Sequence, residues 1–181
     1  MLYPGYEHTG PAAVRYPRGT GPGVAIDSEI TALPIGEARR VRKGNQHIAF
    51  LSFGGLLDQV LLAAEKLDAA VVDMRFVKPL DKNMIQKIAR SHDLLVTVED
   101  NVVAGGAGSA VNEVLHTLKI TVPVLNLGLP DYFQDHGSRE EVLAEAGLDS
   151  DSIRQTVKLF SQDKAQNAQL VYLQNHKNQH L

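Results

Sequence analysis

Apolar runs of strand length alternate with amphipathic stretches of helix length along most of this chain. The apolar runs are His47–Phe53, Ala69–Met74, Leu94–Val98 and Val122–Leu127. The stretches between them place apolar residues at helical spacing, as in Leu56–Leu67 and Asp81–Ser91. The glycine-rich stretch 105–108 leads into a helix that reaches about Leu118. Because strands that are apolar throughout must be covered on both faces, this order predicts an α/β fold. We expect a three-layer α/β/α sandwich with a mostly parallel sheet of four to five strands, and Ala38–Arg42 as a candidate edge strand.

Helix boundaries are indicated by residues that satisfy the free backbone groups at helix ends. Asp81 is a favourable N-cap for the helix that follows it. Ser138, followed by Glu140 and Glu141, predicts the start of a short helix that ends at Gly147. A last helix is expected from Asp149 or Ser150 onward.

The two ends of the chain differ from this pattern. Residues 1–34 are rich in glycine and proline, which predicts loop and linker around at most one short strand, Ala12–Arg15. Residues 162–181 are polar and carry too few apolar side chains to build a core, so a frayed helical or disordered tail is expected. Because they are mostly loop and linker, residues 1–34 are a poor start for a domain that folds alone.

Composition narrows the classes of function. The net charge of −3 over 181 residues gives no reason to expect nucleic acid or an anionic membrane as a partner. The chain has no cysteine, which excludes disulfides and thiolate chemistry and is compatible with a cytoplasmic protein. No apolar run is long enough to span a bilayer, and no secretory signal is visible.

The stretch Arg15-Tyr16-Pro17-Arg18-Gly19 is the strongest candidate for ligand binding. Guanidinium groups flank a Tyr-Pro pair that disfavours helix, and a guanidinium presents a fork of donors that matches phosphate oxygens. From the chemistry of these residues alone, the alternative to ligand binding is a solvated turn that binds nothing.

Other polar motifs leave alternatives open. Gly105-Gly106-Ala107-Gly108 precedes a helix and either admits a phosphate or allows close packing; the spacing does not fit a dinucleotide site and favours packing. The third apolar run ends at Glu99-Asp100-Asn101. Acidic residues at this position serve in proton transfer, bind a metal or cap the next loop. The capping interpretation is favoured here. The alternating charges from Asp73 to Asp81 indicate an ion-paired turn. Among the histidines, His136 is the candidate for a functional role, because it lies in the loop Asp135-His136-Gly137.

Four segments together resemble one enzyme family. They are RYPRG, LSFGGLLDQVLLAAEKLDAAVVDMRFVKPLD, SHDLLVTVEDNVVAGGAGSAVNEVL and VPVLNLGLPDYFQDHGSREEVLAEAGLDS. They are similar to the C-terminal part of 1-deoxy-D-xylulose-5-phosphate synthase, a transferase with a transketolase-type C-terminal domain, over about residues 2–160. The resemblance implies three parts: residues 1–33 as the end of the pyrimidine-binding domain and linker, residues 34–160 as the C-terminal domain, and residues 161–181 as a polar tail.

This family joins pyruvate to glyceraldehyde 3-phosphate with release of CO2, and its product feeds isoprenoid, thiamine and pyridoxal synthesis. The resemblance implies thiamine diphosphate and Mg²⁺ as cofactors, a cytoplasmic homodimer, and Arg18 as the residue that holds the phosphate of glyceraldehyde 3-phosphate. Arg15 has weaker support. No catalytic, cofactor-binding or metal-binding residue is assigned in this chain.

The motifs that carry the cofactor chemistry of the family are not in this sequence. A Gly-Asp-Gly followed by Asn, which binds metal and diphosphate, does not occur, nor does the segment with the cofactor-activating glutamate. We therefore expect the chain alone to bind no cofactor, to be inactive, and to need the preceding domains of the synthase as partners.

Two alternatives stand beside this interpretation. One is a free-standing, non-catalytic α/β module for interaction or oligomerisation. The other is a different thiamine-dependent protein, such as a 2-oxo-acid dehydrogenase β subunit, although RYPRG and DMRFVKPLD favour the synthase.

Overall fold

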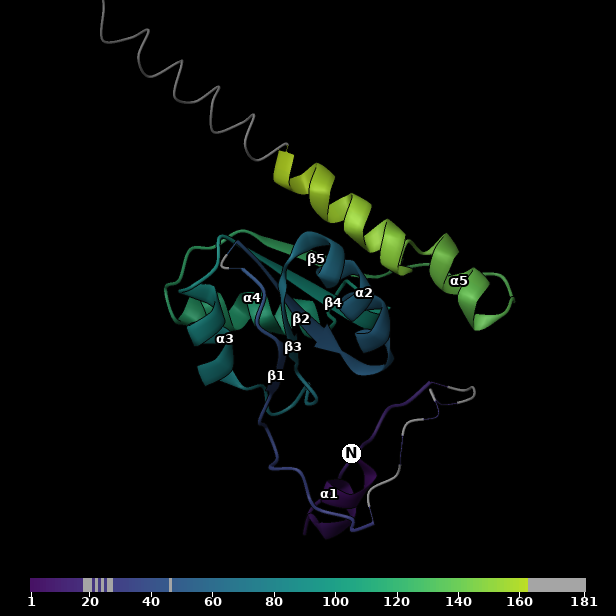
Figure 1. The fold of residues 1–181 in the computed structure, drawn as a ribbon. Coiled ribbons are helices and arrows are strands. Elements are labelled where there is room, and N and C mark those ends of the chain that lie inside the picture. Colours follow the sequence, from purple (N-terminus) through teal and green to yellow (C-terminus); the bar gives the residue numbers. More distant parts are fainter. Residues whose placement is uncertain (18–20, 22, 24, 26–27, 46, 163–181) are drawn as a thin grey trace, which may run out of the picture.

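A five-stranded sheet forms the centre of the molecule in the computed structural model, which describes residues 1–17, 21, 23, 25, 28–45 and 47–162 (Figure 1). The strands are β1 (Arg39–Arg42), β2 (Ile48–Phe53), β3 (Ala70–Asp73), β4 (Leu94–Val102) and β5 (Val124–Leu129). Their order is β1-β3-β2-β4-β5, with β1 antiparallel to β3 and every other pair parallel. The predicted sheet and its edge strand near residues 38–42 are confirmed.

Helices cover both faces of this sheet, as the alternating pattern requires. They are the 3-10 turn η1 (Gly54–Leu56), α2 (Leu57–Leu67), α3 (Lys82–Ala89), α4 (Ala107–Thr117), α5 (Arg139–Glu145) and a helix from residue 150 that is described to residue 162. Within the described part of the chain, none of the helices is long and apolar enough to cross a membrane.

Two buried clusters, one on each face of the sheet, define the three layers. On the first face, Leu51 and Leu95 of the strands pack with Ile88 of α3 and Val111 of α4. On the second face, Phe50 packs with residues of the other helices, including Val60, Leu143, Ile153 and Val157. Neighbouring residues of β2 thus point to opposite cores, which explains why this strand is apolar at every position.

The predicted caps are in place. The Asp81 carboxylate accepts a hydrogen bond from the Met84 backbone N–H at 2.8 Å, and its other oxygen accepts one from the N–H of Ala38 at 2.9 Å. Asp81 therefore begins α3 and also holds the chain that enters β1. Asp149 caps the last helix through the N–H of Ser152 at 3.1 Å, and Gly147 follows α5 with a φ of 70°.

Two expectations for the N-terminal segment are wrong. Residues 2–7 form the helix α1 (Leu2–Glu7) where loop was expected, and Ala12–Arg15 is not a strand. The helix is compatible with Pro4 because this proline lies in the first turn, where a missing backbone N–H breaks no intrahelical bond. The expected tail at residues 163–181 lies outside the described residues.

Strand ends also differ from the prediction. β4 was expected to stop at Val98 but continues to Val102, so Glu99, Asp100 and Asn101 lie inside the strand. The pairing with β5 is irregular between Val98 and Val102, which accommodates polar residues that interrupt the apolar pattern. The fifth strand likewise starts and ends two residues later than expected.

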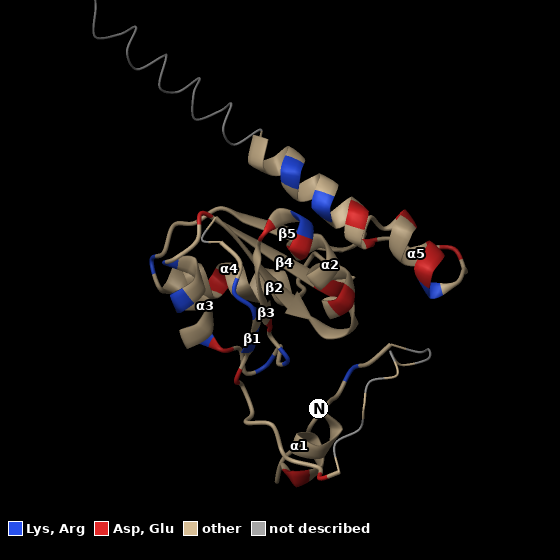
Figure 2. Ribbon diagram, in the orientation of Figure 1, with Lys and Arg blue, Asp and Glu red and all other residues tan. Residues whose placement is uncertain are grey.

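The edge strand β1 is protected by its arginines, as the blue segments around it in Figure 2 indicate. Arg40 folds back so that its guanidinium donates to the backbone carbonyl of Lys43 at 2.6 Å. Arg42 pairs with Asp68 at 3.0 Å. Charged side chains on an edge strand oppose pairing with a second sheet, so the basic composition of β1 has a structural explanation.

Candidate functional site

The carboxyl ends of the four parallel strands lie at one edge of the sheet, where open α/β folds place their ligands. Most of the polar motifs singled out in the sequence are at this edge. Asp73 ends β3 and Arg75 follows it, the Gly54-Gly55 turn follows β2, and Glu99 to Asn101 lie in the last part of β4.

Glu99 is buried at the beginning of α4, with 3% of its surface exposed. One of its carboxylate oxygens accepts a hydrogen bond from the Ala107 N–H at 2.7 Å, and the other accepts one from the Gly108 N–H at 2.9 Å. These donors are backbone groups that a helix leaves free at its N-terminus, where the helix dipole also favours negative charge. Glu99 thus has the structural role that the sequence favoured.

The glycines beside Glu99 are required by close packing. A side-chain carbon at Gly106 would overlap the Glu99 Oε2 atom, and one at Gly108 would come within 2.5 Å of the Thr97 hydroxyl oxygen. The packing interpretation of this glycine-rich stretch is confirmed. Because a carboxylate of the chain itself occupies the helix N-terminus, no space is left there for a phosphate. The positive end of the helix dipole already interacts with Glu99.

Asp100, the next residue of β4, takes part in a second cluster, which brings together residues far apart in sequence. Arg139 donates from Nη2 to the Gly55 carbonyl oxygen at 3.1 Å, and the same nitrogen lies 3.8 Å from the Asp100 Oδ2 atom. Pro17 packs on Gly55, since a side-chain carbon there would lie 3.0 Å from the Pro17 Cγ atom. The last described residue before Arg18 is therefore at the carboxyl edge of the sheet.

The start of α5 fixes the position of Arg139. Ser138 and Glu141 form a reciprocal capping box, with Ser138 Oγ accepting from the Glu141 N–H at 3.2 Å and Glu141 Oε2 accepting from the Ser138 N–H at 2.9 Å. These bonds to Ser138 lower the pKa of the Glu141 carboxyl below its ordinary value. Arg139 is the first helical residue after this cap, so its backbone is firmly placed.

The predicted ion-paired turn after β3 is confirmed. Asp73 accepts a hydrogen bond from the Arg75 N–H at 3.2 Å, and the Arg75 Nε atom lies 3.6 Å from its other oxygen. Burial raises the pKa of the Asp73 carboxyl, and the attraction of Arg75 offsets only part of this effect. The pair stabilises a turn in which Arg75 has a φ of 58°.

The remaining candidate residues do not lie together in one site. Arg18, the substrate-binding candidate, lies outside the described residues. Arg15 is exposed, and His136 is exposed in the loop before α5. In the described part of the chain, no group of three or more histidine, aspartate or glutamate side chains is placed to hold a metal ion.

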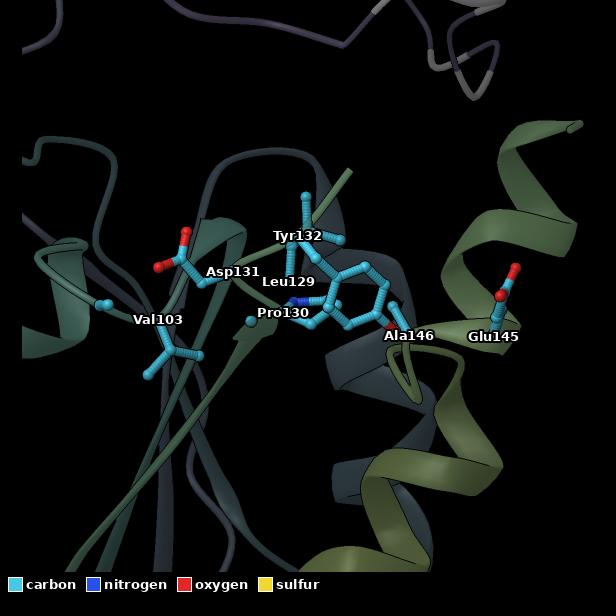
Figure 3. A pocket seen from close by; sticks show the side chains of 9 residues that line it. Val103, Leu129, Pro130, Asp131, Tyr132, Glu145 and Ala146 are labelled. Carbon is cyan, nitrogen blue, oxygen red and sulfur yellow. The ribbon is translucent and has the colours of Figure 1, made fainter. Parts of the chain in front are cut away.

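A shallow hollow of about 440 Å³ lies beyond the end of β5, between Val103, Tyr132 and the end of α5 (Figure 3). Its walls are mainly apolar, and the carboxylates of Asp131 and Glu145 lie at opposite ends of it. Because the two acids do not converge, the hollow presents neither a cation site nor a proton-transfer pair.

Sequence reasoning identified Arg18, Glu99 and Ser138 but missed Gly55 and Arg139. Ser138 signals a helix start, and Arg139 at the next position carries no pattern of its own. The contact between Pro17 and Gly55 joins residues 38 positions apart, for which a single sequence has no signal.

This arrangement is that of a doubly covered, mostly parallel sheet with its polar turns at the carboxyl edge. Residues 36–153 match the family model described as the transketolase C-terminal domain. The chain belongs to this family, and the expected fold and resemblance are confirmed.

Curated relatives carry the name 1-deoxy-D-xylulose-5-phosphate synthase. The protein of Thioalkalivibrio sulfidiphilus is 60% identical over 158 residues, which are 87% of this chain and 24% of that protein. The proteins of Nitrosococcus oceani and Aeromonas hydrophila are 56% and 53% identical, over 88% and 90% of this chain and 25% and 26% of their own lengths. The chain thus spans about a quarter of the length of these relatives.

A solved structure supports the same fold. It is titled "Split gene transketolase, inactive beta4 tetramer", is 28% identical, and superposes with a TM-score of 0.63 over 79% of this chain and 45% of its own.

The cap formed by Glu99 gives a direct test of this description. Glu99→Gln replaces one acceptor oxygen by an amide that faces a backbone donor, so the variant is expected to lose about 2 kcal/mol of unfolding free energy. Urea denaturation of the 181-residue chain measures this. Glu113→Gln, an exposed change on the same helix, is the control and is expected to stay within about 0.5 kcal/mol of the wild type. Equal effects of the two changes would contradict the capping role.

Proposed function

We propose that this chain is the C-terminal part of a 1-deoxy-D-xylulose-5-phosphate synthase. The observation that carries the proposal is the 60% identity over 158 residues to a protein of that name, which includes most of the described chain. The complete enzyme joins pyruvate and glyceraldehyde 3-phosphate and releases CO2, and its product serves isoprenoid, thiamine and pyridoxal synthesis. The names of the relatives favour this enzyme over a 2-oxo-acid dehydrogenase β subunit.

Within that enzyme, Arg18 binds the phosphate of glyceraldehyde 3-phosphate. A guanidinium forms paired, charge-assisted hydrogen bonds with phosphate oxygens, which suits a substrate with a terminal phosphate. Support comes from the neighbouring residue, because Pro17 lies at Gly55, on the edge of the sheet where folds of this class bind ligands.

Thiamine diphosphate and Mg²⁺ belong to the other domains of the synthase in this proposal. A diphosphate with its metal needs converging carboxylates and free backbone donors. In the described residues no such acidic group is found, and Glu99 already uses the donors at the start of α4. The described residues therefore do not fit the cofactor, and we expect the chain alone to be inactive.

The partners of the chain follow from this assignment. Residues 1–33 are the end of the pyrimidine-binding domain and a linker, residues 34–160 are the C-terminal domain, and residues 161–181 are a polar tail. The preceding domains dock against residues 1–33, where Leu2 and Tyr6 are 66% and 84% exposed. The working enzyme is a cytoplasmic homodimer.

The role of Arg18 is tested in the synthase that contains this chain. Arg18→Ala is expected to raise KM for glyceraldehyde 3-phosphate by a factor of about ten or more, since a charge-assisted hydrogen bond contributes about 1.5–3 kcal/mol. KM for pyruvate is expected to stay unchanged. Arg15→Ala, the change of a nearby arginine, is the control and has a smaller effect. Equal rises for both substrates, or for both variants, contradict the assignment.

A free-standing interaction module is the second candidate function. The observation in its favour is that residues 38–160 contain a complete core on both faces of the sheet. The two candidates differ in the size of the native protein.

An antibody raised against residues 40–150 detects that protein in its own cells. A synthase gives a band of roughly three to four times the mass of this chain, because the 158 matched residues are 24% of the relative. A band only at the mass of the 181-residue chain favours the module and contradicts the synthase assignment.

A further inference from the structure

Phe133 is the most exposed large apolar side chain in the described part of the chain. It is 104% exposed, and its neighbour Tyr132 is 66% exposed. Both lie between β5 and α5, where residues 130–138 form neither helix nor strand. A single exposed apolar residue is ordinary, but two adjacent exposed aromatic side chains are typical of a surface that binds another protein.

The hollow beyond β5 extends this apolar surface (Figure 3). Tyr132 forms part of its wall, and Val103, Leu129 and Ala146 add apolar surface. Its volume of about 440 Å³ leaves space for an apolar side chain of a partner. An aromatic side chain beside an apolar hollow is the kind of centre that contributes most of the binding energy of a protein interface.

Two acidic residues flank the hollow, and neither forms an ion pair with another described residue. Asp131 and Glu145 lie at its opposite ends, and both are exposed. The ion pairs of the described chain involve other residues, and no lysine or arginine lines the hollow. A partner that complements this surface therefore presents an apolar side chain between two cations.

The same loop holds a polar group that the described chain leaves without a partner. The Nε2 atom of Gln134 is buried and donates to no acceptor among the described residues. Because a buried amide donor without an acceptor is unfavourable, this loop is incompletely satisfied in the chain alone. The observation is independent of the apolar surface and concerns the same segment.

Helix α5 connects the hollow with the place where the N-terminal segment meets the domain. Glu145, its last residue, lines the hollow, and Arg139, its first, donates to the Gly55 carbonyl oxygen at 3.1 Å. Pro17 lies beside Gly55, with its Cγ atom 3.0 Å from the position of a side-chain carbon there. In the proposed synthase the N-terminal segment leads to the preceding domains, so those domains approach the edge of the sheet at which the hollow lies.

We infer that Asp131, Tyr132, Phe133 and Glu145, with the hollow between them, form a docking surface for the preceding domains of the synthase. Those domains fill it with an apolar side chain between two lysine or arginine residues. The inference rests on the proposed function, in which the chain spans about a quarter of the enzyme. A second copy of the chain is a poorer occupant, because a symmetric contact through this surface brings four unpaired carboxylates together.

The docking surface is tested by alkylation of an introduced cysteine, since the 181-residue chain has none of its own. Phe133→Cys is made in this chain and in the synthase that contains it, and reaction with N-ethylmaleimide is followed by mass spectrometry of the peptide. The rate is expected to be about tenfold or more lower in the synthase, because a covered side chain reacts only when the interface opens. Leu62→Cys on α2, where Leu62 is 50% exposed, is the control and is expected to react equally in both proteins.

Equal rates at position 133 in the two proteins, or the same slowing at positions 62 and 133, overturn the inference. Hydrogen exchange of the unsubstituted proteins guards against loss of docking through the substitution itself. The amides of residues 131–136 are expected to exchange about tenfold more slowly in the synthase than in the 181-residue chain. Equal exchange of these amides also overturns the inference.

The charges of the docking surface are tested by Asp131→Lys combined with Glu145→Lys. In the synthase this pair of changes is expected to speed alkylation of Phe133→Cys toward its rate in the 181-residue chain, because the cations of the partner are then repelled. Glu65→Lys combined with Glu113→Lys, two exposed positions, makes the same change in net charge and is expected to have no effect. Equal effects of the two pairs contradict the charge complementarity.

Other occupants and a failure of the proposed function give different results. If alkylation of the 181-residue chain slows as its concentration rises, a second copy covers the surface, and the assignment to the preceding domains is overturned. A native protein with only the mass of this chain removes the synthase itself. A synthase in which position 133 reacts as fast as in the chain removes the docking surface and leaves the proposed function intact.

Discussion

The contact of the Glu99 carboxylate with the first N–H groups of α4 is the constraint on which the rest of the carboxyl edge depends. It puts a buried negative charge where the helix dipole is positive, at 2.7 and 2.9 Å from two donors. Glycines at 106 and 108 are then required, because any side chain there would overlap Glu99 or Thr97. The contact orders β4, the glycine turn and α4 as one unit.

This use of the helix N-terminus determines where a ligand can bind. A site that would attract a phosphate in many α/β proteins is closed by the chain itself. Cationic groups near the same edge are Arg75, which pairs with Asp73, and Arg139 over the Gly54-Gly55 turn, where Pro17 also lies. In the proposed function, the domain therefore supports the N-terminal segment, and that segment carries the substrate-binding group.

Local patterns were sufficient to predict much of this molecule. Apolar runs gave the sheet and its layers, and Asp81 and Ser138 marked helix starts, because these signals act within a few residues. The continuation of β4 through Glu99–Asn101 was missed since the strand pairs with β5 on both sides of this polar stretch, at Val98 and Val102, which outweighs its composition. Helix α1 was missed because proline is typical of loops as well as of the first turn of a helix. The contact of Pro17 with Gly55 depends on the tertiary fold and has no local pattern.

The central claim is that this chain supplies part of a substrate site and none of the cofactor site. Calorimetric titration of thiamine diphosphate with Mg²⁺ tests it most directly, first into the purified chain and then into the chain mixed with the separately produced preceding domains. No binding to the chain alone is expected, whereas the mixture is expected to bind the cofactor and to regain CO2 release from pyruvate. Tight, Mg²⁺-dependent binding to the chain alone would contradict it.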